Sequence, residues 1–330
     1  MQALIFNGQI QLAHRPVPTP GDGEALIRVR LAGICGTDLA IPRGYADFCG
    51  VMGHEFVGEV VAAPEPQWLG RRVVGEINLP CGECACCRAG LSRHCSQRQV
   101  IGIRGRDGCL AEYLTLPLAN LHPVPETVPD AFAVFTEPLA AALEILEQVH
   151  LRPDSRVLIV GDGRLGLLIA LVLRLHGCEL HLVGRHSRNL DFVRARGVQV
   201  HGAAGFASSG FDVVIEATGN PAGWQTALAA VRPRGTIVVK STHTGRGEMN
   251  PTAVVVPEVT VVGSRCGPFP PALRLLARRL VNPKKLIARI YPLAQAAEAM
   301  QYAAQRGVLK VLVEMPTYAS KVSSVSGTTL

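Results

Sequence analysis

Hydrophobic and polar positions alternate in short runs over roughly the first 125 residues of the chain. A period of two is typical of strands that bury one face, and Gly- and Pro-rich turns separate these runs. We therefore predict that the first part of the chain is β-rich. Its strands are expected at 25–31, 56–62, 72–76 and 111–116.

From about residue 151 the pattern changes to continuous apolar runs that alternate with helical segments. Buried strands that alternate with helices are typical of a doubly wound parallel sheet. The predicted strands cover 156–160, 180–183, 198–201, 212–216, 236–240 and 259–262, and the predicted helices cover 165–177, 189–196, 222–231 and 271–281. A helix over 293–305 and a strand over 310–313 follow, and the last fifteen residues, rich in Ser and Thr, are expected to form a loose tail.

The chain has 330 residues, of which 48% are hydrophobic and 18% charged, and it is long enough for two packed domains. This composition excludes a disordered chain, a collagen-like repeat and a long coiled coil. The longest apolar stretch, 165–173, is much shorter than the roughly 18 residues of a membrane span. The N-terminus has no basic region followed by an apolar one, so we expect a soluble, cytoplasmic protein with no signal peptide and no membrane contact.

The net charge of +7 raises the question of a nucleic-acid partner. The 33 basic residues are spread over the chain, however, and the densest groups are the pairs at 278–279 and 284–285. A surface that follows phosphates usually needs a basic cluster on one face. We expect no nucleic-acid partner, because an anionic small molecule explains a local basic cluster as well.

Residues 161–166 read Gly-Asp-Gly-Arg-Leu-Gly, between a predicted strand and a predicted helix. In that context a GxGxxG pattern favours dinucleotide binding. The glycines allow a tight turn and a close approach of the backbone to a pyrophosphate, and the helix N-terminus offers N–H donors. The alternative is a glycine-rich turn without a ligand. The candidate cofactor-binding residues are Gly161, Gly163, Arg164, Leu165 and Gly166.

The segment after the next strand bears on which dinucleotide binds. An NAD site typically has an Asp or Glu about 20 residues after the glycine pattern, where it accepts hydrogen bonds from the ribose. This chain instead has Gly184, Arg185, His186 and Arg188 there. Because arginine pairs well with the 2′-phosphate of NADP, we predict NADP as the favoured cofactor and NAD as the less favoured one. The alternative is a basic loop at the surface.

Five of the ten cysteines lie between residues 81 and 95. They are too crowded for independent disulfides, and in a cytoplasmic chain such crowding is typical of metal binding. Four thiolates can enclose a tetrahedral Zn²⁺ with no open position, which predicts a structural zinc site. The competing interpretation is a zinc-ribbon nucleic-acid module, whose second widely spaced pair is missing here. The predicted ligands are Cys81, Cys84, Cys87 and Cys95, and Cys86 is an extra thiol.

Two further motifs contain residue types that bind catalytic metals: Cys-Gly-Thr-Asp at 35–38 and Gly-His-Glu at 53–55. A lone Cys or His is more often a core residue, but two turns of a β-domain can bring a thiolate and an imidazole together. The interpretation of this pair as metal ligands is supported by the segment Thr-Glu-Pro-Leu-Ala at 136–140. There Glu137 offers a carboxylate at the expected border of two domains. The alternative for Glu137 is a helix cap or an interdomain ion pair.

The order of these motifs resembles that of the zinc-containing medium-chain dehydrogenase/reductase family, in particular its sorbitol, threonine and glucose dehydrogenase branch. The resemblance covers roughly residues 1–315. It implies a GroES-like catalytic domain formed by 1–140 and 286–330, with a structural zinc lobe at about 81–95, and a Rossmann domain at 141–285. It also implies a homodimer or homotetramer, and 259–265 is a candidate edge-strand interface.

The resemblance further implies a catalytic zinc in the cleft between the domains. Cys35 and His54 would be ligands, Glu137 the third, and Glu55 an alternative or exchanging ligand. Zn²⁺ polarises an alcohol oxygen, so that hydride can leave carbon for the nicotinamide. We therefore expect an oxidoreductase with two zinc ions per chain, which transfers hydride between an alcohol or polyol, or the corresponding carbonyl, and NADP.

The remaining roles are also implied by the resemblance. Asp38 would orient the ligating histidine, and Thr37 would hydrogen-bond the alkoxide and begin a proton relay. Tyr45 would line the substrate pocket, and Cys266 would contact the nicotinamide end of the cofactor. Many relatives carry a histidine five residues after the first cysteine ligand, where this chain has Ala40. The proton would therefore leave through the cofactor ribose, water or another side chain.

Two alternative functions remain open at this point. The first is an NAD-linked sugar or amino-alcohol dehydrogenase. The second is a zinc- and NADP-binding protein without alcohol turnover, a sensor or scaffold, which only the missing histidine favours.

Overall fold

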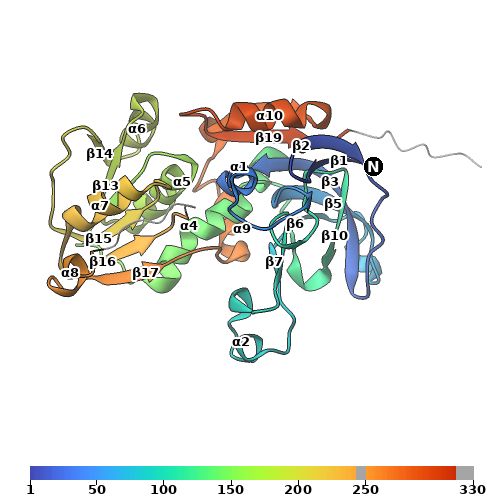
Figure 1. The fold of residues 1–330 in the computed structure, drawn as a ribbon, viewed down its shortest axis with the longest axis horizontal. Helices are drawn as coiled ribbons and strands as arrows, with labels where there is room; N and C mark the ends of the chain where they lie inside the picture. Colours follow the sequence, from blue (N-terminus) through green and yellow to red (C-terminus); the bar gives the residue numbers. More distant parts are fainter. Residues whose placement is uncertain (243–249, 317–330) are drawn as a thin grey trace, which may run out of the picture.

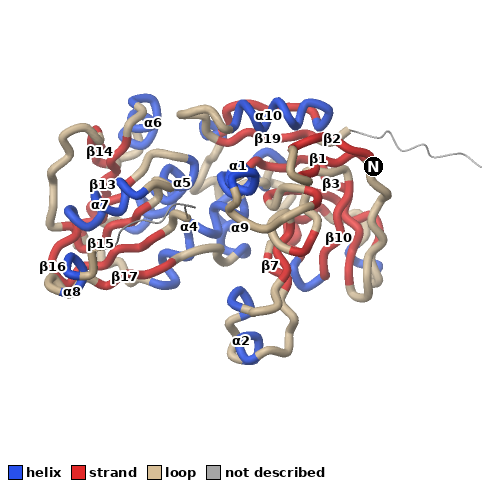
Figure 2. Tube along the Cα trace, viewed as in Figure 1, coloured by secondary structure: helices blue, strands red, loops and turns tan. Residues whose placement is uncertain are grey.

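The structure of the protein is a computed structural model that describes residues 1–242 and 250–316. The predicted Ser- and Thr-rich tail lies outside the described residues, apart from Pro316. Figure 1 shows two parts side by side, with helix α4 (Thr136–Gln148) between them. One part is β-rich and contains the N-terminus, and in the other part strands and helices alternate (Figure 2).

The β-rich part is organised around a seven-stranded sheet. Its central strand, β3 (Glu24–Ile34), pairs antiparallel with β5 (Glu55–Ala62), β10 (Tyr113–Pro117) and β19 (Lys310–Glu314). The first half of β3 alternates between buried and less buried positions, as the sequence pattern predicts, and its last four residues are all buried. The outer strands are β6 (Arg72–Gly75), β11 (Leu121–Pro123) and β18 (Ile287–Pro292).

Smaller elements complete this part. Helix α10 (Ala296–Ala303) packs on β19. One small sheet contains β1 (Gln2–Phe6), β2 (Ile10–His14) and β4 (Gly50–Val51), and another contains β7 (Asn78–Leu79), β8 (Gln99–Ile101) and β9 (Gly105–Arg106). The short helices are α1 (Gly36–Ala40), α2 (Ala85–Arg88), α3 (Asp130–Ala133), η1 (Ile41–Arg43), η2 (Pro66–Trp68), η3 (Ser92–His94), η4 (Leu118–Asn120), η6 (Lys284–Leu286) and η7 (Leu293–Gln295).

The other part contains six parallel strands in the order β14-β13-β12-β15-β16-β17. The strand order reverses at β12, which confirms the predicted doubly wound sheet. The strands are β12 (Arg156–Val160), β13 (Glu179–Gly184), β14 (Gln199–Gly202), β15 (Phe211–Glu216), β16 (Val231–Val239) and β17 (Thr260–Gly263). The helices are α5 (Arg164–Leu173), η5 (Arg174–His176), α6 (Ser187–Arg194), α7 (Pro221–Ala230), α8 (Thr252–Val255) and α9 (Phe269–Ala277). Every helix within the described residues is too short or too polar to cross a membrane.

Helix α4 is the main element that the sequence pattern did not predict. It begins at Thr136, and Pro138 is tolerated there because the first helical turn needs no backbone N–H donor. Seven of its thirteen residues are buried, and three of these are alanines, so it shows no strong apolar stripe in the sequence. The pattern also missed β1, β2 and β18.

Helix α4 joins the cores of the two parts. It packs against α5 and α9, and its Leu139 and Ile145 belong to a hydrophobic cluster that also contains Val57 of β5 and Leu167 of α5. The chain returns to the β-rich part at its end, since β18 and β19 lie in the same sheet as β3. The domain boundaries proposed from the sequence stay a prediction.

A close contact between α4 and the segment after β17 gives a first testable prediction. A Cβ atom at Gly267 would lie 1.7 Å from the carbonyl oxygen of Ala140. Gly267→Ala should therefore lower the free energy of unfolding by about 1–3 kcal/mol, the usual cost of overpacking. Gly263→Ala is the matched control, because its Cβ would meet nothing within 4 Å. Chemical denaturation measures both, and equal stability of the two variants would contradict the contact.

Candidate metal centre and dinucleotide site

Cys35, His54 and Glu55 lie together where β3 and β5 meet. Cys35 follows the end of β3, and Glu55 begins β5, opposite Gly33 in the sheet register. One ligand atom from each of the three side chains lies within 4.8 Å of the other two. His54 is 3% exposed and Glu55 is 1% exposed. The fold thus brings the predicted Cys–His pair together, with His54 buried and Cys35 half-buried.

Asp38 contacts both members of this pair. Its Oδ2 accepts a hydrogen bond from the backbone N–H of Cys35 at 2.8 Å, and its Oδ1 lies 3.3 Å from Nδ1 of His54. Burial alone would lower the pKa of His54, but the charges of Asp38 and Cys35 raise it well above its usual value. The surroundings of His54 therefore favour a positive charge, and a zinc ion would supply one in place of the proton.

The donor set fits zinc. A thiolate, an imidazole and a carboxylate are the ligand types of catalytic zinc sites. Oε1 of Glu55 is buried and has no hydrogen-bond partner within the described residues, which is costly unless a ligand is bound. The arrangement can therefore hold a metal, with further ligands supplied by a second carboxylate, water or substrate.

Lys310 holds the other carboxylate oxygen of Glu55 and was missed by the sequence analysis. Its Nζ forms an ion pair with Oε2 of Glu55 and donates to the carbonyl oxygen of Ile34 at 3.3 Å. The two side chains are separated by 255 positions along the chain and meet because β19 pairs with β3. No local pattern in the sequence signals such a contact.

Glu137 approaches the same region from the first turn of α4. Burial raises its pKa to about 7, and the nearby charges of His54 and Lys310 act in the opposite direction. Glu137 does not belong to the group whose ligand atoms lie within 4.8 Å of one another. Whether Glu55 or Glu137 is the third zinc ligand thus stays open.

Thr37 and Tyr45 lie on the segment after Cys35. Oγ1 of Thr37 is 3.9 Å from Sγ of Cys35, so its hydroxyl lies beside the predicted metal ligand. Tyr45 is half-buried, and its backbone N–H donates to the carbonyl oxygen of Ala40 at 3.2 Å. Its hydroxyl has no hydrogen bond to any described residue, so its predicted substrate role stays a prediction.

Gly53 and Cys109 show how tightly the centre is packed. Gly53 has φ +92°, and a Cβ there would lie 2.7 Å from Cγ of Leu110 and 3.1 Å from Sγ of Cys109. Sγ of Cys109 is 3.5 Å from the carbonyl oxygen of Glu55, and burial raises the pKa of this thiol. Cys109 is therefore a neutral packing partner, and the motif needs glycine immediately before His54.

The four predicted cysteine ligands form a second group. Sγ of Cys95 is 3.5 Å from that of Cys81, and Sγ of Cys87 is 3.5 Å from that of Cys84 and 4.0 Å from that of Cys81. Tetrahedral zinc with Zn–S bonds of about 2.3 Å places its sulfurs about 3.8 Å apart, so this group fits zinc. A hydrogen bond from the backbone N–H of Cys87 lowers the pKa of Cys84 to about 6, which favours the thiolate. Cys86 is outside the group, and all ten cysteines, each within the described residues, have free thiols.

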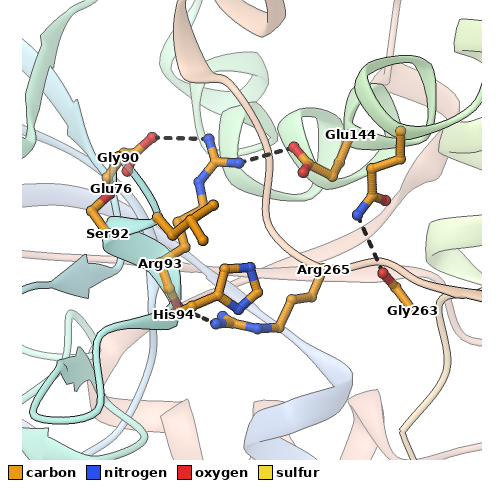
Figure 3. Close-up of a pocket in the computed structure, with 10 residues that line it drawn as sticks. Glu76, Gly90, Ser92, Arg93, His94, Glu144, Gly263 and Arg265 are labelled. Atoms are coloured by element: carbon orange, nitrogen blue, oxygen red, sulfur yellow. Dashed lines mark hydrogen bonds and ion pairs between the residues drawn. The ribbon is translucent and has the colours of Figure 1, made fainter. Parts of the chain in front are cut away.

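Arg93 connects this cysteine lobe to α4, as Figure 3 shows. Its guanidinium forms ion pairs with Glu144 of α4 at 2.9 Å and with Glu76 at 3.7 Å. Arg265, which follows β17, donates to the carbonyl oxygen of Arg93. These contacts line a cleft of about 370 Å³ between the lobe and α4, away from Cys35. The lobe is thereby fixed to the helix whose first turn carries Glu137.

The GxGxxG segment forms the predicted turn between β12 and α5. Gly161 has φ +117°, and a Cβ there would lie 2.9 Å from the carbonyl oxygen of Ala217. A Cβ at Gly166 would lie 2.0 Å from the carbonyl oxygen of Gly161, so only glycine lets the helix pack on this turn. Gly163 caps α5, and its Cβ would meet nothing within 4 Å. The turn therefore presents open space and N–H donors, which fits a pyrophosphate.

The side chains next to these glycines point elsewhere. Arg164 donates to the carbonyl oxygens of Ala303 at 2.6 Å and of Val308 at 3.5 Å, and so contacts the β-rich part. Leu165 packs against the core around α4 and α5. Their cofactor-binding role is thus limited to their backbone at the start of α5, and it stays a prediction.

Asp162 supports the loop after β13, a role that the sequence analysis missed. It is 5% exposed, and its Oδ2 accepts hydrogen bonds from the backbone N–H groups of Arg185 at 3.1 Å and His186 at 2.7 Å. Nδ1 of His186 lies 3.1 Å from the same oxygen. A Cβ at Gly184 would lie 2.5 Å from Cγ of Asp162, which explains the glycine there.

The predicted phosphate-binding arginines are therefore on a supported loop. Arg185 and Arg188 are exposed, and within the described residues neither guanidinium has a hydrogen-bond or ion-pair partner.

At the far end of the sheet, Cys266 has φ 56° and follows β17. Its Sγ accepts from Nδ2 of Asn78 at 3.3 Å and from Nη1 of Arg265 at 3.3 Å.

Comparison with known proteins supports this arrangement. Residues 21–126 match the family described as alcohol dehydrogenase GroES-like domain, and residues 165–278 match the one described as zinc-binding dehydrogenase. The L-threonine 3-dehydrogenase of Edwardsiella ictaluri (strain 93-146) is 34% identical over 68% of this chain and 71% of that protein. The L-galactonate-5-dehydrogenase of Escherichia coli (strain K12) is 29% identical over 91% of this chain and 94% of that protein.

A solved structure agrees with these matches. A protein from Sinorhizobium meliloti 1021, described as a zinc-binding dehydrogenase bound to NADP, has 29% sequence identity and a TM-score of 0.88. The match covers 95% of this chain and 98% of that one. The predicted fold class, a GroES-like β-rich domain with a Rossmann sheet, is confirmed.

The cysteine lobe gives a second testable prediction. Cys95→Ser should remove one zinc ion per chain and lower the melting temperature, because the structural site needs all four thiolates. Cys86→Ser is the matched control in the same lobe and should change neither quantity. Metal analysis by mass spectrometry and thermal unfolding measure the two effects. An unchanged zinc content in the Cys95 variant would rule out the proposed ligand set.

Proposed function

This chain belongs to the zinc-containing medium-chain dehydrogenases, and we propose that it interconverts an alcohol or polyol and the corresponding carbonyl with NADP. It is an oxidoreductase of the zinc-dependent alcohol dehydrogenase type, and it acts on CH–OH groups with a nicotinamide cofactor.

One observation carries the proposal: the half-buried Cys35 and the buried His54 and Glu55 form a group close to Glu137, which the first turn of α4 places at the border of the two parts. When bound, zinc and the nicotinamide supply Lewis-acid and hydride-acceptor chemistry. Cys35, His54 and one of the two glutamates hold the metal. Asp38 fixes the imidazole orientation through its 3.3 Å contact with Nδ1.

The proton of the substrate hydroxyl passes to Oγ1 of Thr37, which lies beside Cys35. Ala40 offers no group to continue the relay, so Thr37 would pass its own hydroxyl proton to water, to another side chain or, with a cofactor bound, to the ribose. Glu55 is paired with Lys310 through Oε2, and its Oε1 is the atom that would bind the metal if Glu55 is the third ligand. Tyr45, close to the Cys35 segment, contributes to the wall of the substrate pocket.

NADP is the favoured cofactor because two unpaired, exposed arginines lie on the loop where an NAD site carries a carboxylate. The pyrophosphate would lie on Gly161, Gly163 and Gly166, and the nicotinamide near Cys266. The Sinorhizobium meliloti protein with NADP supports this choice by similarity. The alternative is an NAD-linked sugar or amino-alcohol dehydrogenase, which the similarity to an L-threonine 3-dehydrogenase favours.

We further propose two zinc ions per chain and a homodimer or homotetramer. Strand β17 is an edge of its sheet, and Val255, Val256 and Val261 are 70%, 76% and 41% exposed nearby, which supports an interface there. Ten free thiols support a cytoplasmic location. The division into domains at 140 and 285 follows the return of β18 and β19 to the first sheet.

The first test of the function is turnover. The zinc-loaded protein is mixed with NADP or NAD and with each member of a panel of alcohols, polyols and aldehydes. The change in nicotinamide absorbance then measures the rate of turnover. Cys35→Ser should lower kcat/KM at least about 100-fold without loss of fold, because it removes a metal ligand. Cys49→Ser, at an exposed cysteine, is the control. Full activity of the Cys35 variant would exclude the assigned centre, and activity absent from wild type across the panel would favour a binding protein without turnover.

The cofactor preference has its own test. Arg185→Asp should weaken NADP binding by at least about tenfold and leave NAD binding unchanged or improved, because it replaces a phosphate-binding charge with a ribose-binding one. Arg278→Asp makes the same charge change at an exposed position after α9 and should alter neither. Dissociation constants for both cofactors come from fluorescence titration. An unchanged NADP affinity would refute the phosphate assignment.

A further inference from the structure

Lys240 is a buried lysine that none of the assigned roles uses. It follows the last residue of β16 and is 9% exposed. Its Nζ donates to the carbonyl oxygen of Ala141 in α4 at 2.7 Å and to Oγ of Ser264, which follows β17, at 2.9 Å. One amine thus ties α4 to the carboxyl ends of two neighbouring strands.

Among the described residues, no carboxylate directly neutralises the charge of this amine. Both hydrogen-bond acceptors are neutral oxygens, and no carboxylate of a described residue lies within 4.0 Å of Nζ. Burial lowers the pKa of Lys240 to about 8, while Glu144, Cys266 and Glu137 act at longer range to raise it. Near pH 7 the amine therefore remains mostly protonated and is a positive charge inside the protein.

The position of Lys240 in the sheet relates it to the nicotinamide half of the cofactor. A doubly wound sheet binds a dinucleotide across the carboxyl ends of its strands, with one mononucleotide on each side of the point where the strand order reverses. That point is β12, and the Arg185 loop after β13 identifies the adenosine side. A bound cofactor would therefore place its nicotinamide half over the ends of β15, β16 and β17, where Lys240 and Ser264 are found.

We propose that the Lys240 ammonium weakens binding of the oxidised nicotinamide cofactor relative to the reduced one. The oxidised ring carries a positive charge and the reduced ring is neutral, so a nearby cation repels only the oxidised form. A low-polarity environment strengthens this effect, because the charge is not screened by water. The inference rests on the proposed function in that a nicotinamide cofactor binds at the GxGxxG turn with its adenosine end at the Arg185 loop.

The test compares dissociation constants of oxidised and reduced cofactor, for both the NADP and the NAD pair, in the zinc-loaded protein at pH 7. Wild type should bind the reduced form more tightly. In Lys240→Met the ratio of the oxidised to the reduced dissociation constant should fall about tenfold, which corresponds to about 1.4 kcal/mol. Lys240→Arg, which keeps the charge, should retain the wild-type ratio.

Two further variants separate charge from structural support. Ser264→Ala removes one hydrogen bond and keeps the amine, so it should leave the ratio unchanged. Lys240→Gln is neutral and keeps a donor for Ala141, so it should reproduce the Met ratio even where the Met variant folds poorly. Equal weakening of both forms in the neutral variants would overturn the proposal and leave Lys240 a purely structural residue. Wild type that binds neither cofactor pair would overturn the proposed function, and this inference with it.

Discussion

The close packing of α4 against the carboxyl ends of β16 and β17 is the contact on which the other features depend. There is no room for a methyl group between Gly267 and Ala140, and Lys240 donates directly to the next carbonyl of the helix. The first turn of the same helix carries Glu137, and its last turns carry Glu144 and the Gln148 amide, which donates to Gly263 at 3.2 Å. The position of one helix thus determines where the candidate metal centre, the carboxyl ends of β16 and β17 and the cysteine lobe lie relative to one another.

Buried charges around the metal centre come in pairs that distant parts of the chain complete. Asp38 of α1 faces His54, which directly precedes β5, and Lys310 of β19 forms an ion pair with Glu55. Removing one partner of such a pair leaves an uncompensated buried charge, which costs about 3–5 kcal/mol. These pairs therefore hold the ligands in place before a metal binds, and they also make the centre sensitive to the arrangement of the whole sheet.

Much of the fold and many of the candidate residues could be predicted from local pattern. The continuous apolar run at Arg156–Val160 and the glycines after it specify the strand, turn and helix by themselves. Helix α4 was not predicted because only two of its seven buried residues, Leu139 and Ile145, are large aliphatic ones, and three are alanines. The structural roles of Asp162 and Lys240 were not predicted for a different reason. Their partners, His186 and Ala141, are brought to them by three-dimensional packing, and nothing in the neighbouring sequence indicates these contacts. The choice between Glu55 and Glu137 likewise depends on distances that spacing along the chain does not determine.

The pairing of β19 with β3 has a consequence for synthesis on the ribosome. The six strands of the parallel sheet come from one continuous stretch of the chain. Strand β3, in contrast, cannot pair with β19 until the ribosome has synthesised β19, whose first residue is Lys310. Until then residues 31–34 of β3 have unpaired N–H and C=O groups along one edge, although β10 already pairs with residues 24–28, and the Glu55 carboxylate lacks its cation. The nascent chain thus carries an open sheet edge through most of its translation, which is the state in which strands pair with the wrong partner or recruit chaperones.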